Sequence, residues 1–296
     1  MLRKLLLWIP VLAVVALLVF LLPPHLQVRS VSTSPPEFAD LAALQRPDGP
    51  TSVHYVVNAE QSLDRGLLSH SIFVFEWPDG KLLLVDAGMR SGQAAAFAEL
   101  LGTIGGGGEA VFHGNIADLL GDRVADVAGI AFTHLHIDHT EGVIALCEAT
   151  QGNPALLQTR NQADKHNFNT TESAAILGAS CVRPAPMNEG SIWTSDAFPG
   201  LGLIAAGGHT PGSTAFAAWV QGQLYVLSGD ITNTKADILT DSGKGWVYSN
   251  LFVPEDTGQT RELRRWLDRL GNRSDTTVVV SHDLADIVAS SIPELP

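Results

Sequence analysis

The chain has 296 residues, enough for one large domain with a well-buried core or for two small ones. Lys and Arg total 18 against 31 Asp and Glu, a formal net charge of -13. This balance argues against nucleic-acid binding, because phosphate contacts need a concentrated basic surface.

The N-terminus carries an uncharged apolar run, residues 5–22, preceded by Arg3 and Lys4. Its length approaches the ~20 residues that span a hydrocarbon core. No small-x-small cleavage site follows, which favours an uncleaved membrane anchor over residues 1–24 rather than a cleaved signal peptide. Basic residues before the run predict that the rest of the chain lies outside the cytoplasm, in the periplasm of a Gram-negative cell. If the segment is cleaved, the protein is secreted instead.

Residues 25–50 are rich in Pro and Ser, which predicts a linker with a short helix near 38–44, and a folded domain over 51–296. In that domain, apolar runs and turn residues predict strands at 52–57, 71–77, 81–86, 127–132, 201–206, 214–220, 223–227 and 276–280. Helical patterns cover 91–101, 115–120, 140–149 and 256–270. The glycine run 105–108 predicts a flexible linker, and Arg264 and Arg265 are expected on the solvated face of the last helix.

The two cysteines, Cys147 and Cys181, show no CxxC spacing that would indicate a thiolate site. Cys147 lies in a helical pattern, which favours a small core residue. The sequence leaves a disulfide between the two open.

The strongest chemical signal is the stretch His134-Leu135-His136-Ile137-Asp138-His139, directly after an apolar strand. Imidazole and carboxylate side chains hold Zn²⁺ or iron while leaving room for a bound water. Four such residues cannot complete a two-metal site, so the pattern predicts further ligands downstream. Three candidates follow later strands: His209, Asp230 and His282.

Taken together, these segments resemble the metallo-β-lactamase superfamily. Asp86-Ala87-Gly88, the His-rich stretch, Gly-His209-Thr-Pro-Gly, Ser-Gly-Asp230 and Ser-His282-Asp look like the motifs of that family, in the family's order. The resemblance implies an α+β fold, an αβ/βα four-layer sandwich with metals at one end between the sheets.

The resemblance also implies a role for each motif residue. His134, His136 and His209 would bind one metal, Asp138, His139 and His282 the second, and Asp230 both. Asp86 would accept a hydrogen bond from a ligand imidazole, although a plain strand-end turn explains it equally well.

The implied cofactors are two divalent ions, Zn²⁺ first, with Mn²⁺ or Fe²⁺ as alternatives. A metal-bridged hydroxide would attack the carbonyl of a small-molecule ester, lactone or thioester, and Asp138 or Asp230 would accept and return a proton. The alternatives are a phosphodiesterase and a mononuclear iron persulfide dioxygenase of the same fold.

Asp230 argues against β-lactamase activity, because true β-lactamases lack a bridging Asp, and the segments around His209 and His282 look most like those of quorum-quenching lactonases. That group's catalytic Tyr would stand at position 233, which is Asn233 here, and Tyr248 is a spatial substitute to test. Four aromatic residues in loop-rich regions are candidates for an acyl pocket or for ordinary core and surface positions: Trp193, Phe198, Trp246 and Phe252.

Overall fold

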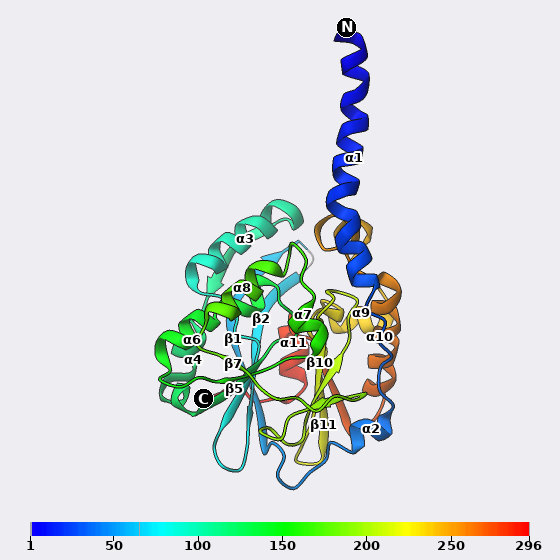
Figure 1. Cartoon of the computed structure of the whole chain (residues 1–296). Coiled ribbons are helices and arrows are strands. Elements are labelled where there is room, and N and C mark those ends of the chain that lie inside the picture. Colours follow the sequence, from blue (N-terminus) through cyan, green and yellow to red (C-terminus); the bar gives the residue numbers. More distant parts are fainter. Residues whose placement is uncertain (1, 65, 296) are drawn as a thin grey trace.

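Two β-sheets pack face to face in the computed structural model, which describes residues 2–64 and 66–295 (Figure 1). The first sheet, in spatial order, contains β4 (Gly107–Phe112), β1 (Ser52–Leu63), β2 (Gly66–Glu76), β3 (Leu82–Val85), β5 (Val127–Ala131), β6 (Ala155–Leu157) and β7 (Arg183–Pro184). The second contains β12 (Thr276–Val279), β11 (Gln223–Leu227), β10 (Thr214–Val220), β9 (Leu201–Ala205) and β8 (Trp193–Thr194).

Alternation along the strands divides the apolar side chains between two layers, because successive residues of a strand point to opposite faces. In β2, Phe73 and Phe75 join the core between the sheets, where they meet Phe216 and Leu227 of the second sheet. Ile72 of the same strand faces the other way, toward the helices outside the first sheet.

Helices cover both outer faces. Outside the first sheet pack α4 (Ile116–Leu120), α6 (Val143–Ala149) and α8 (Thr171–Ala179), and α3 (Ser91–Gly105) packs on β1 and β4. Outside the second sheet pack α2 (Phe38–Ala42), α9 (Lys235–Thr240) and α10 (Thr257–Gly271). The predicted αβ/βα sandwich is therefore confirmed.

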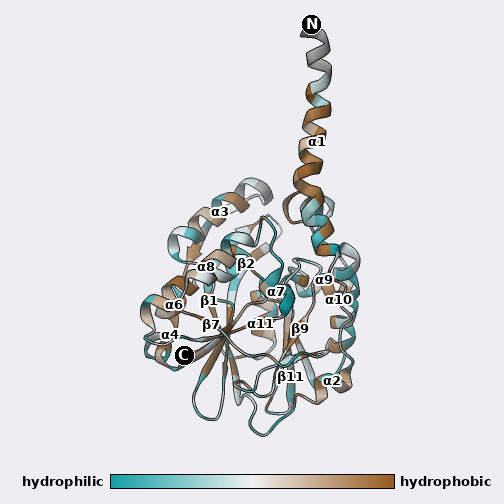
Figure 2. Ribbon diagram, in the orientation of Figure 1, coloured by the Kyte–Doolittle hydropathy of each residue, from teal (hydrophilic) through white to brown (hydrophobic). Residues whose placement is uncertain are grey.

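The remaining elements are shorter, apart from the N-terminal helix. They are α1 (Leu2–Arg29), α5 (Ile137–Thr140), α7 (Arg160–Asp164), α11 (Leu284–Ala289), the 3₁₀ turns η1 (Gly121–Asp126) and η2 (Gly229–Ile231), and the π-helical turn η3 (Tyr248–Phe252). Helix α1 projects from the domain and is apolar along most of its length (Figure 2).

The segment between α1 and β1 lies against the domain rather than away from it. Val31 and Leu41 are buried, Thr33 donates a hydrogen bond to the Ala206 carbonyl, and Trp266 donates one to the Pro36 carbonyl. The division into anchor, linker and domain stays a prediction, but the 25–50 segment has fixed contacts.

Two local predictions are wrong. The glycine run 105–108 is not simply a flexible linker, because Gly107 begins β4 and pairs with Leu63 of β1. Arg264 is buried and forms an ion pair with Asp241, whereas Arg265 is exposed as expected.

Cys147 of α6 forms a disulfide with Cys181, which lies between α8 and β7, so Cys147 is not a free core thiol. The bridge closes a loop of 34 residues, which restricts the unfolded chain. We expect the Cys147→Ser/Cys181→Ser variant to lose about 3–4 kcal/mol of unfolding free energy, by the loop-closure relation. Urea unfolding with and without a reductant measures it, and a reductant should leave the double variant unchanged. Equal stability of the oxidised parent and the double variant would refute the bridge.

Candidate metal centre

The predicted ligands meet because five strands end at the same edge of the sandwich. Strands β3 and β5 run parallel in the first sheet, and β11 and β12 run parallel in the second. Strand β9 has the same direction as β11, since both are antiparallel to β10. The loops after these strands supply Asp86, the His-rich stretch, His209, Asp230 and His282.

The His-rich stretch is held in shape by the loop after β3. His136 precedes the helical turn α5, so the stretch is part loop and part helix rather than a loop throughout. The Ala87 amide donates to the His139 carbonyl at 2.8 Å, and the Gly142 amide donates to the Gly88 carbonyl at 2.8 Å. A Cβ on Gly142 would lie 2.1 Å from the Ala87 carbonyl oxygen, so only glycine allows this close approach.

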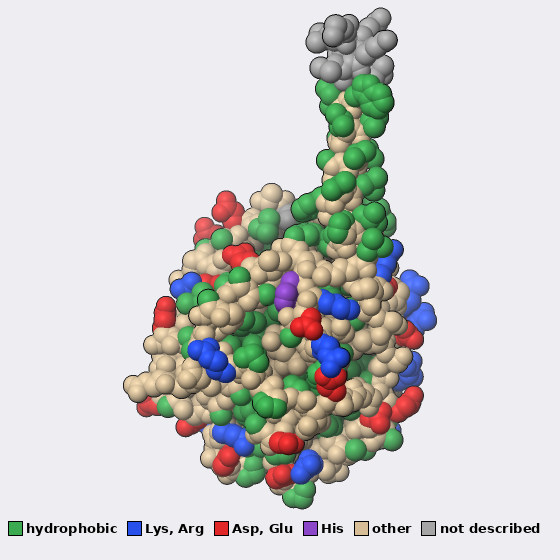
Figure 3. Space-filling view, viewed as in Figure 1, with side chains coloured by type: hydrophobic (Ala, Val, Ile, Leu, Met, Phe, Trp, Pro, Cys, Tyr) green, Lys and Arg blue, Asp and Glu red, His purple; other side chains and the backbone are tan. Residues whose placement is uncertain are grey.

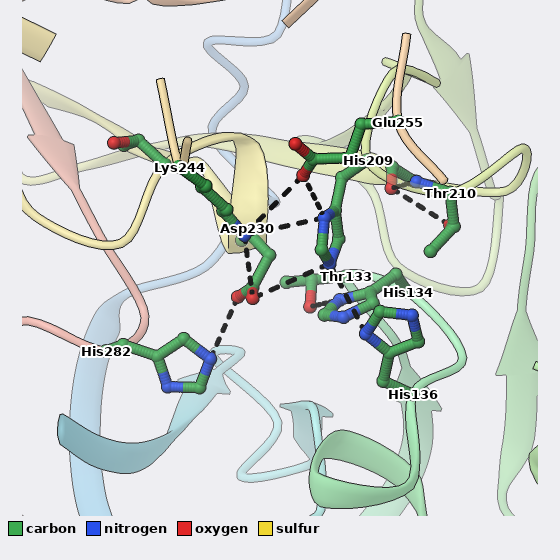
Figure 4. Close-up of polar contacts among 12 residues, drawn as sticks. Thr133, His134, His136, His209, Thr210, Asp230, Lys244, Glu255 and His282 are labelled. Carbon is green, nitrogen blue, oxygen red and sulfur yellow. Dashed lines mark hydrogen bonds and ion pairs between the residues drawn. The ribbon is translucent and has the colours of Figure 1, made fainter. Parts of the chain in front are cut away.

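One group of ligand atoms comes from His134, His136 and His209, whose available nitrogen atoms lie within 4.8 Å of one another. His136 Nδ1 and His209 Nε2 are 3.3 Å apart, and the rings of His134 and His136 stand at 75° (Figure 4). Three imidazoles converging in this way form a donor set that suits a divalent transition metal.

A second group lies beside it, around Asp138, His139 and His282. His139 Nε2 is 3.3 Å from His282 Nε2 and 3.4 Å from Asp138 Oδ2. His70 of β2 joins this group, because its Nδ1 is 3.4 Å from Asp138 Oδ2 and its ring packs edge-on against His282.

Asp230 lies between the two groups, with one carboxylate oxygen toward each. Its Oδ1 is 3.0 Å from His282 Nε2 and 3.6 Å from His139 Nε2. Its Oδ2 is 3.7 Å from His209 Nε2 (Figure 4). The structure thus brings all the predicted ligands together, and it places Asp230 where a single carboxylate reaches both sets.

Two buried ring nitrogen atoms, His134 Nε2 and His136 Nε2, have no hydrogen-bond partner among the described residues. Two more buried atoms, His70 Nδ1 and Asp230 Oδ1, face a carboxylate and an imidazole at 3.4 Å and 3.0 Å without hydrogen-bond geometry. An unsatisfied buried polar atom costs about 1–3 kcal/mol, so such a cluster calls for another partner. Imidazole and carboxylate atoms without partners, at this spacing, fit bound divalent cations.

Electrostatics favour the metal-binding forms of His134, His136 and Asp230. Burial holds the pKa of His134 and of His136 well below the usual histidine value, which keeps both imidazoles neutral. Burial opposes the ionisation of Asp230, but the neighbouring His282 and Lys244 outweigh it and hold its pKa well below the usual value. Asp230 is therefore a carboxylate at neutral pH. Burial opposes protonation of His139 and His282, but Asp138 and Asp230 respectively outweigh it and raise the pKa of both imidazoles, so these two would release a proton on binding a metal.

The outer nitrogen atoms of the ring ligands are fixed by partners behind them. Asp86 Oδ2 lies 2.9 Å from His139 Nδ1, and the same carboxylate accepts from the Thr133 amide at 2.8 Å. His282 Nδ1 lies 2.7 Å from the Ser69 carbonyl. A partner of this kind sets the tautomer and leaves the other nitrogen free for a metal.

Asp86 has the geometry expected from both interpretations. It ends β3 in a tight turn with φ of 69°, a left-handed conformation that is uncommon for any residue other than glycine. The turn directs its carboxylate at His139, and strained backbone of this kind is concentrated at functional sites.

Glu255 is a buried partner that the sequence analysis did not identify. Its Oε1 lies 2.6 Å from His209 Nδ1, and Ser249 donates to its other oxygen. Burial works against ionisation of Glu255, but the hydrogen bond from His209 outweighs it and lowers its pKa. No strand precedes Glu255, so the strand-end pattern could not reveal it, and His70 was missed because it lies inside a strand.

Lys244 and Tyr248 complete one wall of the centre. Lys244 Nζ is 3.3 Å from Asp230 Oδ2 and 5.4 Å from the centre of the Tyr248 ring. Burial and the carboxylates of Asp230 and Glu255 raise the pKa of Tyr248 well above its usual value, so the phenol keeps its proton. Tyr248 therefore lies near the centre, where it could take the place of the tyrosine that Asn233 replaces.

Glu255→Gln tests the support of His209. We expect zinc affinity to fall about 10–100-fold, because the neutral amide no longer fixes the imidazole as a carboxylate does. Glu141→Gln is the matched control, since Glu141 is also buried but pairs with Arg90 instead of a ligand. Competition with a chelating dye measures both, and equal affinities would exclude the role of Glu255.

Of the aromatic acyl-pocket candidates, Phe198 is in the core between the sheets and Trp193 is half-buried against it. Trp246 and Phe252 are exposed, at 70% and 41%.

Comparisons with known proteins agree with this architecture. An N-acyl homoserine lactone hydrolase with N-hexanoyl-L-homoserine bound at its catalytic metal centre is similar, at a TM-score of 0.60 and 17% identity over 81% of this chain and 96% of that chain. A mutant of AiiA from B. thuringiensis with N-decanoyl-L-homoserine bound is similar too, at a TM-score of 0.60 and 16% identity over 81% of this chain and 96% of that chain. The dizinc lactonase AidC matches at a TM-score of 0.50 and 14% identity over 79% of this chain and 88% of that chain.

At these identities the similarity establishes the fold alone. A search of curated protein sequences finds no match. The family model described as the metallo-beta-lactamase superfamily matches residues 65–282, which include all of the predicted ligands. The chain belongs to the metallo-beta-lactamase superfamily and is a metal-dependent hydrolase.

Proposed function

We propose that this protein is a membrane-anchored hydrolase with two divalent metals, Zn²⁺ first, acting on a small-molecule lactone, ester or thioester. The observation that carries the proposal is the position of Asp230. One of its oxygens faces His139 and His282 and the other faces His209, so its carboxylate can bridge two ions.

Two ions so placed would lower the pKa of a shared water and polarise a carbonyl oxygen. The chain's own residues would then accept and donate the protons that the reaction moves. Asp138 and Asp230 are ionised carboxylates at the centre and can accept a proton and return it. Tyr248 keeps its phenolic proton and can donate it to a developing oxyanion or leaving oxygen.

Lys244 has a supporting role in this scheme. Its ammonium lies 3.3 Å from Asp230 and 3.9 Å from Glu255, so it offsets the negative charge that the two carboxylates bring to one side of the centre. A buried ammonium between two carboxylates also fixes the loop that carries Tyr248.

The substrate class draws support from two sources. Similar structures bind acyl homoserines, which are products of lactone opening. Lys244 is the one lysine or arginine with an ion pair to a proposed ligand within the described residues, which provides little positive charge for a phosphodiester.

The proposed location outside the cytoplasm rests on α1 and on the disulfide. The stretch Trp8–Arg29 is long and apolar enough to cross a membrane. Disulfides persist in oxidising compartments and are rare in the cytosol, so the Cys147–Cys181 bridge favours an extracytoplasmic domain.

A hydrolysis screen tests the proposal. The full chain in detergent micelles, reloaded with Zn²⁺ or Mn²⁺, should open acyl lactones and cleave related esters faster than phosphodiesters or β-lactams. Iron content with oxygen uptake on glutathione persulfide, and no hydrolysis, would overturn it in favour of the dioxygenase.

Tyr248→Phe tests the proton donor. We expect kcat to fall about 100-fold with bound metal unchanged, because positioned proton transfer contributes ~10²–10⁴-fold. Tyr225→Phe removes a phenol from β11, in the sheet and away from the centre, and should keep activity within about twofold. If the two variants retain equal kcat, Tyr248 has no part in the chemistry.

A further inference from the structure

The C-terminal end of helix α1, called its foot below, packs against two segments: the loop around Phe168 and the turn η3. The Phe20 ring, still within the apolar run 5–22, packs 5.0 Å from the ring of Phe168. Gln27 donates to the His166 carbonyl at 2.9 Å, and His25 Nε2 lies 3.1 Å from the Asn250 carbonyl. Figure 1 shows the orange turn η3 beside the foot of α1.

The same two segments expose large apolar side chains to solvent. We define the foot patch as Phe168 (41% exposed), Trp246 (70%), Val247 (54%), Leu251 (39%) and Phe252 (41%). Asn169 donates to the Phe252 carbonyl at 3.0 Å, which joins the two segments into one surface. In Figure 3 hydrophobic side chains run down α1 and continue at its foot.

The charge of the foot patch differs from that of the chain as a whole. Residues 165–171 and 242–254 contain no Asp or Glu, although Asp164, Glu172, Asp241 and Glu255 flank them directly. Exposed Trp and other apolar side chains beside an apolar helix long enough to cross a membrane are typical of a surface that enters the membrane interface. Because the Phe168 ring lies 5.0 Å from the ring of Phe20 in the apolar run, this surface would lie at the depth where that run leaves a bilayer.

The foot patch is also continuous with the metal centre. In η3, Leu251 and Phe252 are exposed, whereas the Tyr248 ring has Lys244 Nζ over it and Ser249 donates to Glu255. Glu255 in turn holds His209. A stretch of ten residues, 246–255, therefore has one side at the foot patch and the other at the proposed ligands.

From this continuity we propose that the foot patch lies in the bilayer surface and that the enzyme takes its substrate from the membrane. The substrate is an amphiphile whose long acyl chain stays in the lipid while its hydrolysable carbonyl group reaches the metal centre. The substrate class rests on the proposed hydrolase function, and the position of the foot patch rests on the proposed membrane anchor.

The position is tested by fluorescence of the full chain in phosphatidylcholine vesicles. In a Trp8→Phe background, which removes the tryptophan of α1, lipids brominated along their acyl chains should quench a component of the emission. Trp246→Phe should abolish that component. Emission that brominated lipids do not quench, or quenching that survives Trp246→Phe, would overturn the proposal.

The substrate class is tested by a ratio of rates. The rate of hydrolysis of a long-chain acyl lactone in the same vesicles is divided by the rate for its short-chain, water-soluble homologue. Because a loss of folded protein lowers both rates equally, it does not change this ratio. Trp246→Ser/Val247→Ser should lower the long-to-short ratio at least tenfold. Val288→Ser removes an equally exposed valine (59%) from α11 and should leave the ratio unchanged.

The outcomes separate the two claims. Quenching of Trp246 without hydrolysis of any acyl lactone or ester contradicts the proposed function and leaves the membrane position standing. An unchanged ratio in the double variant overturns uptake from the membrane. Concentration-dependent shielding of Trp246 in detergent, without lipid quenching, would assign the foot patch to a second copy of the chain instead.

Discussion

Asp230→Asn is expected to lower kcat/KM by about 10³-fold or more, the scale of losing a key electrostatic contact at a reaction centre. The amide has nearly the same shape but lacks the charge, and its nitrogen cannot bind a metal. One of the two ligand groups therefore loses its shared carboxylate oxygen, either Oδ1 beside His282 or Oδ2 beside His209. Bound metal should fall from two equivalents toward one.

The matched control is Asp268→Asn on α10, which makes the same change of charge on a half-buried residue of the helix outside the second sheet. It should retain metal and activity within about twofold, because surface changes of this kind have small effects. Activity in Asp230→Asn equal to that of the control would exclude Asp230 from the centre.

Removal of metal is expected to lower the melting temperature by about 8–16 °C. A ligand present at 1,000 times its Kd stabilises the folded state by about 4 kcal/mol, and each kcal/mol shifts the midpoint by about 2–4 °C in a domain of this size. The metal-free protein must also keep buried imidazoles and carboxylates in contact without a cation.

Differential scanning calorimetry before and after dialysis against a chelator measures this shift, and added Zn²⁺ should restore the midpoint. His134→Ala, which lacks one ligand, should respond less to the same treatment. A parent protein whose midpoint stays constant while its metal content falls to zero would show that these residues are stabilised without metal.

The predicted ligands could be found in the sequence because each ligand segment follows an apolar run, whereas the fold was implied by the resemblance of these segments to the metallo-β-lactamase superfamily. A strand buried on both faces appears as a continuous apolar stretch, and the polar residue that ends it stands out. Strands β10 and β11 have the predicted bounds, and His209, Asp230 and His282 follow β9, β11 and β12 as expected.

The supporting residues could not be found in this way. Glu255 and Lys244 reach the centre from one long segment, whose path is set by contacts with α1 and with the loop around Asn169. His70 lies within β2, and only the strand order of the first sheet, in which β3 separates β2 from β5, brings it to Asp138. Such contacts depend on tertiary structure and leave no local pattern.

The local errors have the same origin. Gly107 pairs with β1 although glycine has low strand propensity, because a neighbouring strand supplies the hydrogen bonds. Arg264 is buried because Asp241, from the end of α9, compensates its charge. In both cases a tertiary partner overrides the tendency of the residue itself.

Titration of the metal-free protein with Zn²⁺ is the most direct test of the two-metal centre, with hydrolase activity followed in the same samples. We expect two equivalents to bind per chain and full activity to require the second. Saturation of both binding and activity at one equivalent would contradict it.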